Sequence, residues 1–255
     1  AGDRESFIAA LQNGADAIYL GGTLFSARAN AKNFNDEDLQ WAVSYAHLYG
    51  VKVYVTINTL YKDKEMNALT SYVTKLYELQ VDALIVQDIG LFDLIRTLYP
   101  DFEIHISTQA SVMNSYGTRY FEENGAHRVV LARENTLEEI QNICRQTNLE
   151  IEVFVHGAMC VCYSGQCLMS SMIGKRSGNR GQCAQPCRLQ YQLLKDGQSL
   201  PEKHPYLLSP KDIMTIEYLG ELIEAGVSSL KIEGRMKRPE YVASVTRAYR
   251  EAIDA

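Results

Sequence analysis

The sequence contains no long apolar run and no leader of the secretory kind. None of its stretches approaches the roughly 18 to 20 consecutive apolar residues that span a bilayer. Its opening residues, AGDRE, contain neither the charged segment nor the apolar segment of a signal peptide. We therefore expect a protein of the cytoplasm that has no membrane partner.

An excess of positive charge is also missing. The chain has 25 Lys and Arg residues against 31 Asp and Glu residues, which gives a formal net charge of −6. An acidic protein has no general field that attracts nucleic acid, so binding of RNA would need a local basic patch.

Several catalytic motifs are absent as well. No GxGxxG opens a helix after an early strand pattern, which argues against dinucleotide binding of the Rossmann type. Neither GxSxG nor HExxH occurs, so the usual serine and zinc peptidases are not indicated. A cysteine peptidase that pairs Cys160 with His156 stays open as an alternative.

Cysteine is scarce except in one segment, where five of the six residues lie between positions 160 and 187. Such clustering favours a metal site over a disulfide scaffold. Cys160, Cys167, Cys183 and Cys187 could hold an iron–sulfur cluster or Zn²⁺. Zinc sites favour closely spaced pairs at both ends, and only the second pair here qualifies, so iron–sulfur is preferred over zinc and over free thiols. Cys162 is a spare thiol or a substitute ligand.

What recurs along the chain is a β/α unit, and 46% hydrophobic content in 255 residues is enough for one large core. Apolar, β-rich runs indicate strands, and amphipathic patterns fill nearly every gap between them. Alternation of this kind predicts a parallel sheet. The predicted strands cover residues 16–20, 52–57, 83–86, 103–107, 128–132, 150–155 and 229–233.

The chain opens with a helical pattern at about residues 4–12, and no strand pattern precedes it. Adding one upstream strand gives eight β/α units, so we predict an α/β fold, a (β/α)8 barrel of the TIM type whose first strand is missing from this sequence. Residues 1–255 would form a single domain. A cysteine-rich insertion at 157–208 would separate strands 7 and 8. A doubly wound open sheet is the alternative fold.

Side-chain alternation along the strands places polar groups on the inner face of the barrel. For Glu103 and Glu152, at strand starts, a structural network is expected. The active sites of such barrels lie at the carboxyl ends of the strands. We therefore take as catalytic candidates five residues near those ends, Gln109, Arg133, His156, Glu233 and Arg235. His105, in the middle of its strand, is a further candidate, with a core position as the alternative.

Basic residues gather in the insertion and after the last strand. On an acidic protein they predict a positively charged mouth that receives phosphates or a small dicarboxylate, with a solvated basic loop as the alternative. The residues expected to bind such a cofactor or ligand are Arg180, Arg188 and Lys237.

Six sequence blocks resemble the collagenase-like peptidase family of unassigned catalytic type. Four of them are EVFVHGAMC at 152–160, SGQCLMS at 164–170, NRGQCAQPCR at 179–188 and FSARANAKNF at 25–34. The other two are LSPKD at 208–212 and KIEGRMK at 231–237. The resemblance runs along nearly the whole chain.

This resemblance implies a function other than proteolysis. Branches of the family are oxygen-independent hydroxylation proteins that act on tRNA wobble uridine, on ribosomal RNA cytidine or on a ubiquinone precursor. Carried over to this chain, the resemblance implies a four-iron four-sulfur cluster on Cys160, Cys167, Cys183 and Cys187. Some quinone-branch relatives take one ligand from farther downstream, where this chain has no cysteine.

The resulting hypothesis is an RNA-modifying enzyme that hydroxylates tRNA wobble uridine at carbon 5. Its expected partners are tRNA or another RNA, together with prephenate as a dicarboxylate oxygen donor. Two other hypotheses stay open. One is a peptidase that degrades collagen-like chains, and the other is a zinc-stabilised binding barrel without catalysis.

Overall fold

All seven predicted strands form, and they lie side by side in one parallel sheet. The computed structural model describes residues 1–27, 31–201 and 204–255, so residues 28–30 of the family block at 25–34 lie outside the described residues. The sheet runs in the order β1-β2-β3-β4-β5-β6-β10, and each strand pairs with its neighbour in parallel. The strands are β1 Ala17–Gly21, β2 Lys52–Ile57, β3 Ala83–Val86, β4 Glu103–Ile106, β5 Arg128–Val130, β6 Glu150–Gly157 and β10 Ser229–Ile232.

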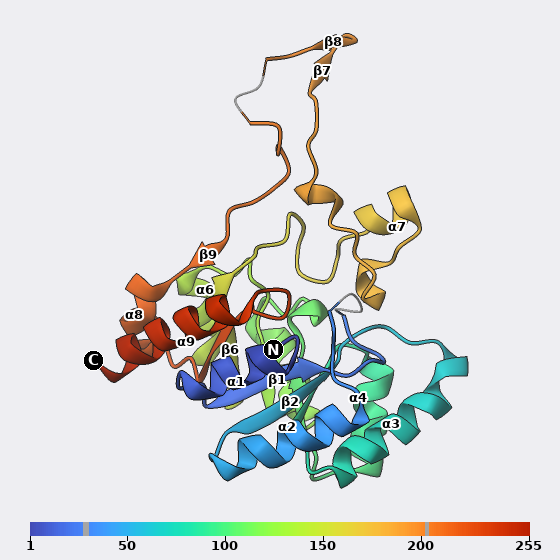
Figure 1. Ribbon diagram of the computed structural model, residues 1–255, viewed down its shortest axis with the longest axis vertical. Coiled ribbons are helices and arrows are strands. Elements are labelled where there is room, and N and C mark those ends of the chain that lie inside the picture. The colour runs from blue at the N-terminus through green and yellow to red at the C-terminus, as the bar shows by residue number, and fades with distance from the viewer. Residues whose placement is uncertain (28–30, 202–203) are drawn as a thin grey trace.

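Helices connect the strands and cover the outer face of the curled sheet (Figure 1). They are α1 Arg4–Gln12, α2 Asp36–Leu48, α3 Met66–Glu78, α4 Ile89–Leu98, α5 Ser115–Glu123, α6 Leu137–Cys144, α8 Leu219–Glu224 and α9 Pro239–Asp254. A further helix, α7 Met169–Gly174, belongs to the segment after β6 and lies away from this face. Short 3-10 turns are η1 Asp63–Glu65, η2 Thr108–Ala110, η3 Gly178–Arg180, η4 Pro186–Arg188 and η5 Ile216–Tyr218. In the described parts of the chain no helix is both long and apolar enough to cross a membrane.

Local sequence explains where several helices begin. Asn35 caps α2 and accepts from the Asp38 backbone nitrogen, while the Asp38 carboxylate accepts from the Asn35 nitrogen. Thr136 and Glu139 form the same reciprocal arrangement at the start of α6. Such capping satisfies backbone donors that the first turn of a helix leaves without partners.

The outward apolar side chains of the strands pack on the helices and form the core, as alternation predicts. Ile104, Ile106, Ile151, Val153 and Val155 all belong to this buried cluster. The inward positions carry a mixture of polar groups and a small separate apolar cluster of Tyr54, Ala83 and Ile85. This arrangement concentrates functional groups on the axis of the sheet.

The first residues of the chain lie beside the end of β10. The amino group of Ala1 donates to the Tyr19 carbonyl of β1 at 2.6 Å. A Cβ on Gly2 would lie 2.1 Å from the Arg235 carbonyl, just past β10. Within the described residues β1 and β10 share no ladder with each other, so the sheet is a curled, open half-barrel.

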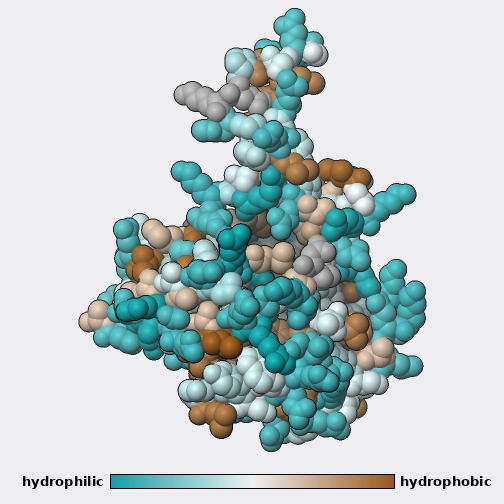
Figure 2. All heavy atoms as spheres, in the orientation of Figure 1, coloured by the Kyte–Doolittle hydropathy of each residue, from teal (hydrophilic) through white to brown (hydrophobic). Residues whose placement is uncertain are grey.

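The segment between β6 and α8 breaks the β/α rhythm, in agreement with the long insertion that the sequence indicates. It contains α7, η3 and η4, then a small hairpin of β7 Leu194–Lys195 and β8 Gln198–Ser199 that stands clear of the body (Figures 1 and 2). A short strand that the sequence did not indicate, β9 Ile213–Met214, returns the chain to the sheet. It pairs antiparallel with His156 and Gly157 at the end of β6.

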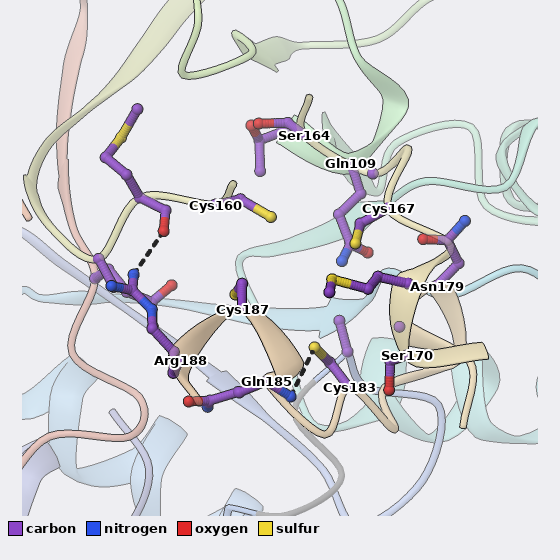
Figure 3. A pocket seen from close by; sticks show the side chains of 18 of the residues that line it. Gln109, Cys160, Ser164, Cys167, Ser170, Asn179, Cys183, Gln185, Cys187 and Arg188 are labelled. Carbon is purple, nitrogen blue, oxygen red and sulfur yellow. Dashed lines mark hydrogen bonds between the residues drawn. The ribbon is translucent and has the colours of Figure 1, made fainter. Parts of the chain in front are cut away.

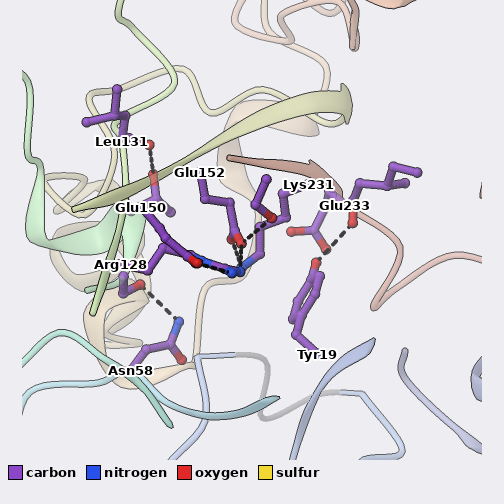
Figure 4. Close-up of polar contacts among 12 residues, drawn as sticks. Tyr19, Asn58, Arg128, Leu131, Glu150, Glu152, Lys231 and Glu233 are labelled. Atoms are coloured by element: carbon purple, nitrogen blue, oxygen red, sulfur yellow. Dashed lines mark hydrogen bonds and ion pairs between the residues drawn. The ribbon is translucent and has the colours of Figure 1, made fainter. Parts of the chain in front are cut away.

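The starts of the strands enclose a buried ion network (Figure 4). The Glu152 carboxylate accepts from Lys231 Nζ at 2.6 Å and from Arg128 Nη1 at 3.0 Å. Arg128 also pairs with Glu150, and Ser229 Oγ donates to Glu152 at 2.8 Å. Burial alone would raise the pKa of Glu152, but Lys231 and Arg128 outweigh it and lower that pKa to about 2. The structural role expected for Glu152 is therefore what the contacts show.

Candidate functional site

Four cysteines of the insertion surround one hollow. Cys160, Cys167, Cys183 and Cys187 line a cavity of about 220 Å³. Figure 3 shows their side chains around this space, with Gln109 and Arg188 also bordering it. Arg133 and Glu233, at the carboxyl ends of β5 and β10, belong to the same lining. The cysteine cavity therefore lies over the strand ends, where the sequence predicts the site.

Each cysteine is presented by a short irregular segment. Cys160 follows the end of β6, Cys167 precedes α7, Cys183 lies between η3 and η4, and Cys187 lies within η4. Ser170 Oγ accepts from the Ala184 nitrogen at 2.9 Å and so ties the second cysteine pair to α7. The Gln185 nitrogen donates to the Cys183 sulfur at 3.4 Å. This contact fixes the position of the Cys183 sulfur at the edge of the cavity.

Ser164 anchors the first half of the cysteine loop and was not identified from the sequence. Its backbone nitrogen and hydroxyl donate to Glu134 Oε1 at 3.1 and 3.3 Å, and its side chain is buried. Ser111 Oγ donates to the Ser164 carbonyl. Glu134, which follows a strand end, could have indicated such a residue, because a carboxylate at that position needs hydrogen-bond donors from the loop above it.

Two glycines allow the loop to touch the barrel. Gly165 has φ +78°, and a Cβ there would lie 2.0 Å from the Gln109 carbonyl oxygen. Gly181 has φ +77°, and its Cβ would lie 2.3 Å from the Ser26 carbonyl oxygen. Both positions combine a left-handed backbone with a close approach to another backbone, which only glycine accommodates.

Replacing Gly181 by Ala should therefore lift this part of the loop from the barrel. We expect the free energy of unfolding to fall by about 2 kcal/mol, because strain of 1–3 kcal/mol is typical when a side chain is forced into such a position. Gly174→Ala is the matched control, because Gly174 lies in the same loop and a Cβ there meets nothing within 4 Å. Urea unfolding of both variants tests this, and equal stability of the two would contradict it.

The predicted basic residues occupy three different settings. Arg188 lines the cysteine cavity, but its guanidinium donates to the Met159 and Pro210 carbonyls, both at 2.7 Å, so it braces the loop. Arg180 lies outside the cavity lining. Its guanidinium donates to both Glu65 oxygens at 2.6 and 3.1 Å, and this contact lowers the pKa of Glu65 to about 2.

Lys237 lines the cavity together with Arg188. Its ammonium lies 3.3 Å from Asp212 and 4.8 Å from the centre of the Tyr241 ring. The positive charge at the mouth is thus partly neutralised by acidic neighbours.

A second, polar cavity of about 60 Å³ continues from the cysteine cavity down the axis of the sheet. The two share Gln109, Arg133 and Glu233. Arg133 lies 3.6 Å from Glu233 and 3.8 Å above the Phe154 ring. Arg235 is buried, and its guanidinium donates to Ser26 and Asn33 at 2.9 and 2.8 Å. These predicted catalytic residues therefore converge on one continuous space.

His156 lies elsewhere, and the expectation that it faces inward with Glu152 and Phe154 is wrong. The ladder between β6 and β10 shifts, so that Lys231 pairs with Phe154 but Ile232 pairs with His156. This bulge turns the imidazole onto α9, where its centre lies 5.8 Å from that of Tyr241 and 5.6 Å from that of Tyr249. A bulge inserts an extra residue into one strand, so the side chains that follow it point to the opposite face of the sheet.

His105 does face inward but lies below the two cavities. It is 1% exposed, its ring centre lies 4.6 Å from that of Tyr54, and Nε2 lies 3.6 Å from Glu103. Burial lowers the pKa of His105, so the ring is neutral near pH 7. Its contacts are those of a core residue inside the curled sheet.

The donor set can be tested against the two metals that the sequence suggested. A tetrahedral zinc site with bonds of about 2.3 Å requires sulfur atoms about 3.8 Å apart. In the part of the chain that the structure describes, no three Cys, His, Asp or Glu side chains are close enough to share one ion. The four cysteines instead border one hollow without closing on a single ion.

Two thiols near the cavity are poor nucleophiles by themselves. Burial raises the pKa of the Cys187 thiol above its usual range, although the Arg188 charge opposes this effect. Burial likewise raises the pKa of Cys162. A thiol with a raised pKa is protonated at neutral pH, so neither of these two is suited to unaided nucleophilic attack.

The sequence is similar to those of several known proteins along nearly its whole length. The chain is 41% identical over 261 residues to tRNA hydroxylation protein P1 of Bacillus subtilis (strain 168), covering 100% of the chain and 62% of that protein. It is 44% identical over 246 residues to the 23S rRNA 5-hydroxycytidine synthase of Escherichia coli (strain K12), covering 96% and 37%. A protein named collagenase from Porphyromonas gingivalis is 37% identical over 269 residues, covering 100% and 64%.

The chain thus spans less than two thirds of the length of each of these relatives. Among solved structures, that of the U32 peptidase Mk0906 matches with a TM-score of 0.51 and 20% identity, over 58% of this chain and 63% of that one. This likeness supports the fold. The profile of peptidase family U32 matches residues 2–255. The chain therefore belongs to peptidase family U32, the collagenase-like family that its sequence blocks resemble.

Proposed function

We propose that this chain is the catalytic barrel of an RNA hydroxylation enzyme. In this proposal, Cys160, Cys167, Cys183 and Cys187 hold a four-iron four-sulfur cluster, and the substrate is the wobble uridine of tRNA, hydroxylated at carbon 5 without dioxygen. The observation that carries the proposal is the convergence of four cysteines on one cavity above the strand ends. The names of the relatives from Bacillus subtilis and Escherichia coli support RNA as the substrate.

We propose a small dicarboxylate such as prephenate as the oxygen donor, bound in the cysteine cavity with a carboxylate directed toward the polar cavity on the sheet axis. Two guanidinium groups, those of Arg133 and Arg235, lie in its walls, and Lys231 closes its lower end. Planar guanidinium groups bind carboxylates through paired hydrogen bonds. Arg235 is held by Thr56 at 3.2 Å in addition to Ser26 and Asn33, so its position is fixed before a ligand arrives.

Glu233 is the residue of this chain placed to move a proton. It is shared by both cavities, is 9% exposed, and lies beside Arg133. A carboxylate placed between the oxygen donor and the uracil ring accepts the proton that leaves carbon 5 of the uracil. When bound to the four cysteines, the cluster would supply the redox chemistry of the hydroxylation, and Met159 and Met169 in the cavity wall would limit access of water.

The test combines metal analysis with the analysis of RNA. Protein purified without oxygen should contain iron and acid-labile sulfide, and tRNA from a deletion strain should lack 5-hydroxyuridine and its derivatives by nucleoside mass spectrometry. Re-expression of the full-length protein should restore them. Zinc in place of iron with unchanged tRNA would contradict the proposal, and release of peptides from collagen by the same preparation would favour a peptidase.

A further inference from the structure

Beside the cysteine cavity lies a second hollow with a different lining. Its volume is about 450 Å³, and it shares Gln109, Gly165 and Asn179 with the cysteine cavity. Gln87 and Gln166 complete a set of four carboxamide side chains around it. Figure 3 shows two of the four, Gln109 and Asn179, on the side of the cysteine cavity nearest Cys167. We call this space the carboxamide hollow.

Two of these amides have acceptor atoms without partners. Gln87 Nε2 donates to the Gln109 backbone carbonyl at 3.2 Å, which fixes the orientation of that amide in the wall of the hollow. Within the described residues, the buried Oε1 atoms of both Gln87 and Gln109 receive no hydrogen bond. A buried acceptor without a donor costs free energy. The carboxamide that a ligand reaches most directly is that of Gln166, which is exposed and lines the same hollow.

The charge of the lining selects among ligands. Asp88 is the single charged residue among those that line the hollow in the described chain, so an anion such as a phosphate would be repelled. Its carboxylate accepts from the Leu91 and Tyr61 nitrogens at 3.0 and 3.2 Å, so it already caps α4. Phe121 and the half-exposed Ile89 add apolar surface. A neutral, flat ligand with both donors and acceptors fits this combination.

Unpaired nucleobases have these properties. A carboxamide carries one acceptor and one donor side by side, which match the edge of a base, and flat bases also pack on apolar side chains. We propose that the carboxamide hollow binds the unpaired base adjacent to the nucleotide that is hydroxylated. This inference rests on the proposed function, because the shared wall at Gln109 and Gly165 places the two bases on neighbouring sites.

The first test is a coupling measurement. The probe is an anticodon stem-loop RNA with uridine at the first anticodon position, compared with versions in which either neighbouring nucleotide lacks its base. One abasic version should bind about tenfold more weakly to the wild-type protein, the loss expected for one amide–base pair. Gln87→Leu and Gln166→Leu should weaken binding of the intact RNA similarly and should show no further loss with that abasic version. Gln146→Leu, an exposed glutamine after α6, is the control.

The inference would be overturned if the loss of affinity from the abasic RNA simply added to the loss from Gln87→Leu or Gln166→Leu. It would also be overturned if neither abasic version bound more weakly. A second measurement separates this failure from that of the proposed function. RNA containing 4-thiouridine next to the target should crosslink to peptides that contain residues 87–90 or 109–110. Crosslinks confined to other peptides, with hydroxyuridine still dependent on the protein, would overturn the hollow alone. No crosslink and no dependence of hydroxyuridine on the protein would overturn both.

Discussion

Replacing Lys231 by Met should lower the free energy of unfolding by about 3–5 kcal/mol, the cost typical of breaking a buried ion pair from one side. Glu152 is 3% exposed and accepts hydrogen bonds from Lys231, Arg128 and Ser229. Without the ammonium, the carboxylate keeps only one strong positive partner while remaining buried. Urea unfolding at neutral pH measures the loss directly.

The matched variant removes both charges of the pair. Lys231→Met combined with Glu152→Leu should be more stable than Lys231→Met alone, because the buried carboxylate is gone and Arg128 keeps Glu150 as its partner. Lys75→Met is a surface control, because its partner Asp36 is well exposed and such pairs contribute little. If the double variant were no more stable than Lys231→Met, the network would not be the source of the loss.

The same network gives stability a defined dependence on pH. The pKa of Glu152 is about 2 in the folded protein, below the ordinary carboxyl value of about 4.3. A depressed pKa means that the unfolded state binds the proton first, so this contribution is complete above about pH 5 and disappears as the pH falls toward 2. The difference in stability between wild type and Lys231→Met should therefore narrow over that interval. A constant difference would contradict the assignment.

Sequence patterns were sufficient for the sheet because strand identity depends on local composition. The seven apolar runs, the helix beginning at Arg4 and the inward polar groups all follow from period and capping. The orientation of the His156 side chain could not be predicted from alternation along the strand. It depends on a bulge that forms where β6 pairs with β10, a strand more than 70 residues away. Inward alternation holds only as long as the ladder is regular.

The candidate site was also predictable from the sequence only in part. The positions of the cysteines relative to the strand ends followed from chain order, since a loop after β6 must lie over the mouth. The partner of Arg180 did not follow, because Glu65 lies 115 residues away and pairs across two loops. The sequence likewise suggested that Arg188 would bind a ligand, but its guanidinium donates hydrogen bonds to backbone carbonyls of its own loop. Long-range pairing of charged groups is a property of the assembled surface.

The cysteines themselves provide the sharpest functional prediction. Replacing any one of Cys160, Cys167, Cys183 or Cys187 by Ser should remove most of the bound iron and reduce 5-hydroxyuridine in tRNA to about a tenth of wild type or less. Loss of an outer partner alone commonly costs 10–100-fold, and loss of a ligand costs at least that much. Iron, sulfide and nucleoside analysis of the same anaerobic samples provides the measurement.

Two other cysteines make this pattern diagnostic. Cys144 lies at the end of α6 and packs against the core, away from the cavity, so Cys144→Ser should retain iron. Cys162 lies two residues past Cys160 but does not belong to the cavity lining in the described chain, so Cys162→Ser should also retain it. Loss of iron in Cys162→Ser with retention in Cys187→Ser would instead make Cys162 the fourth ligand. Because that exchange would move one attachment point from η4 to the start of the loop, it would reshape the cavity above Arg133 and Glu233.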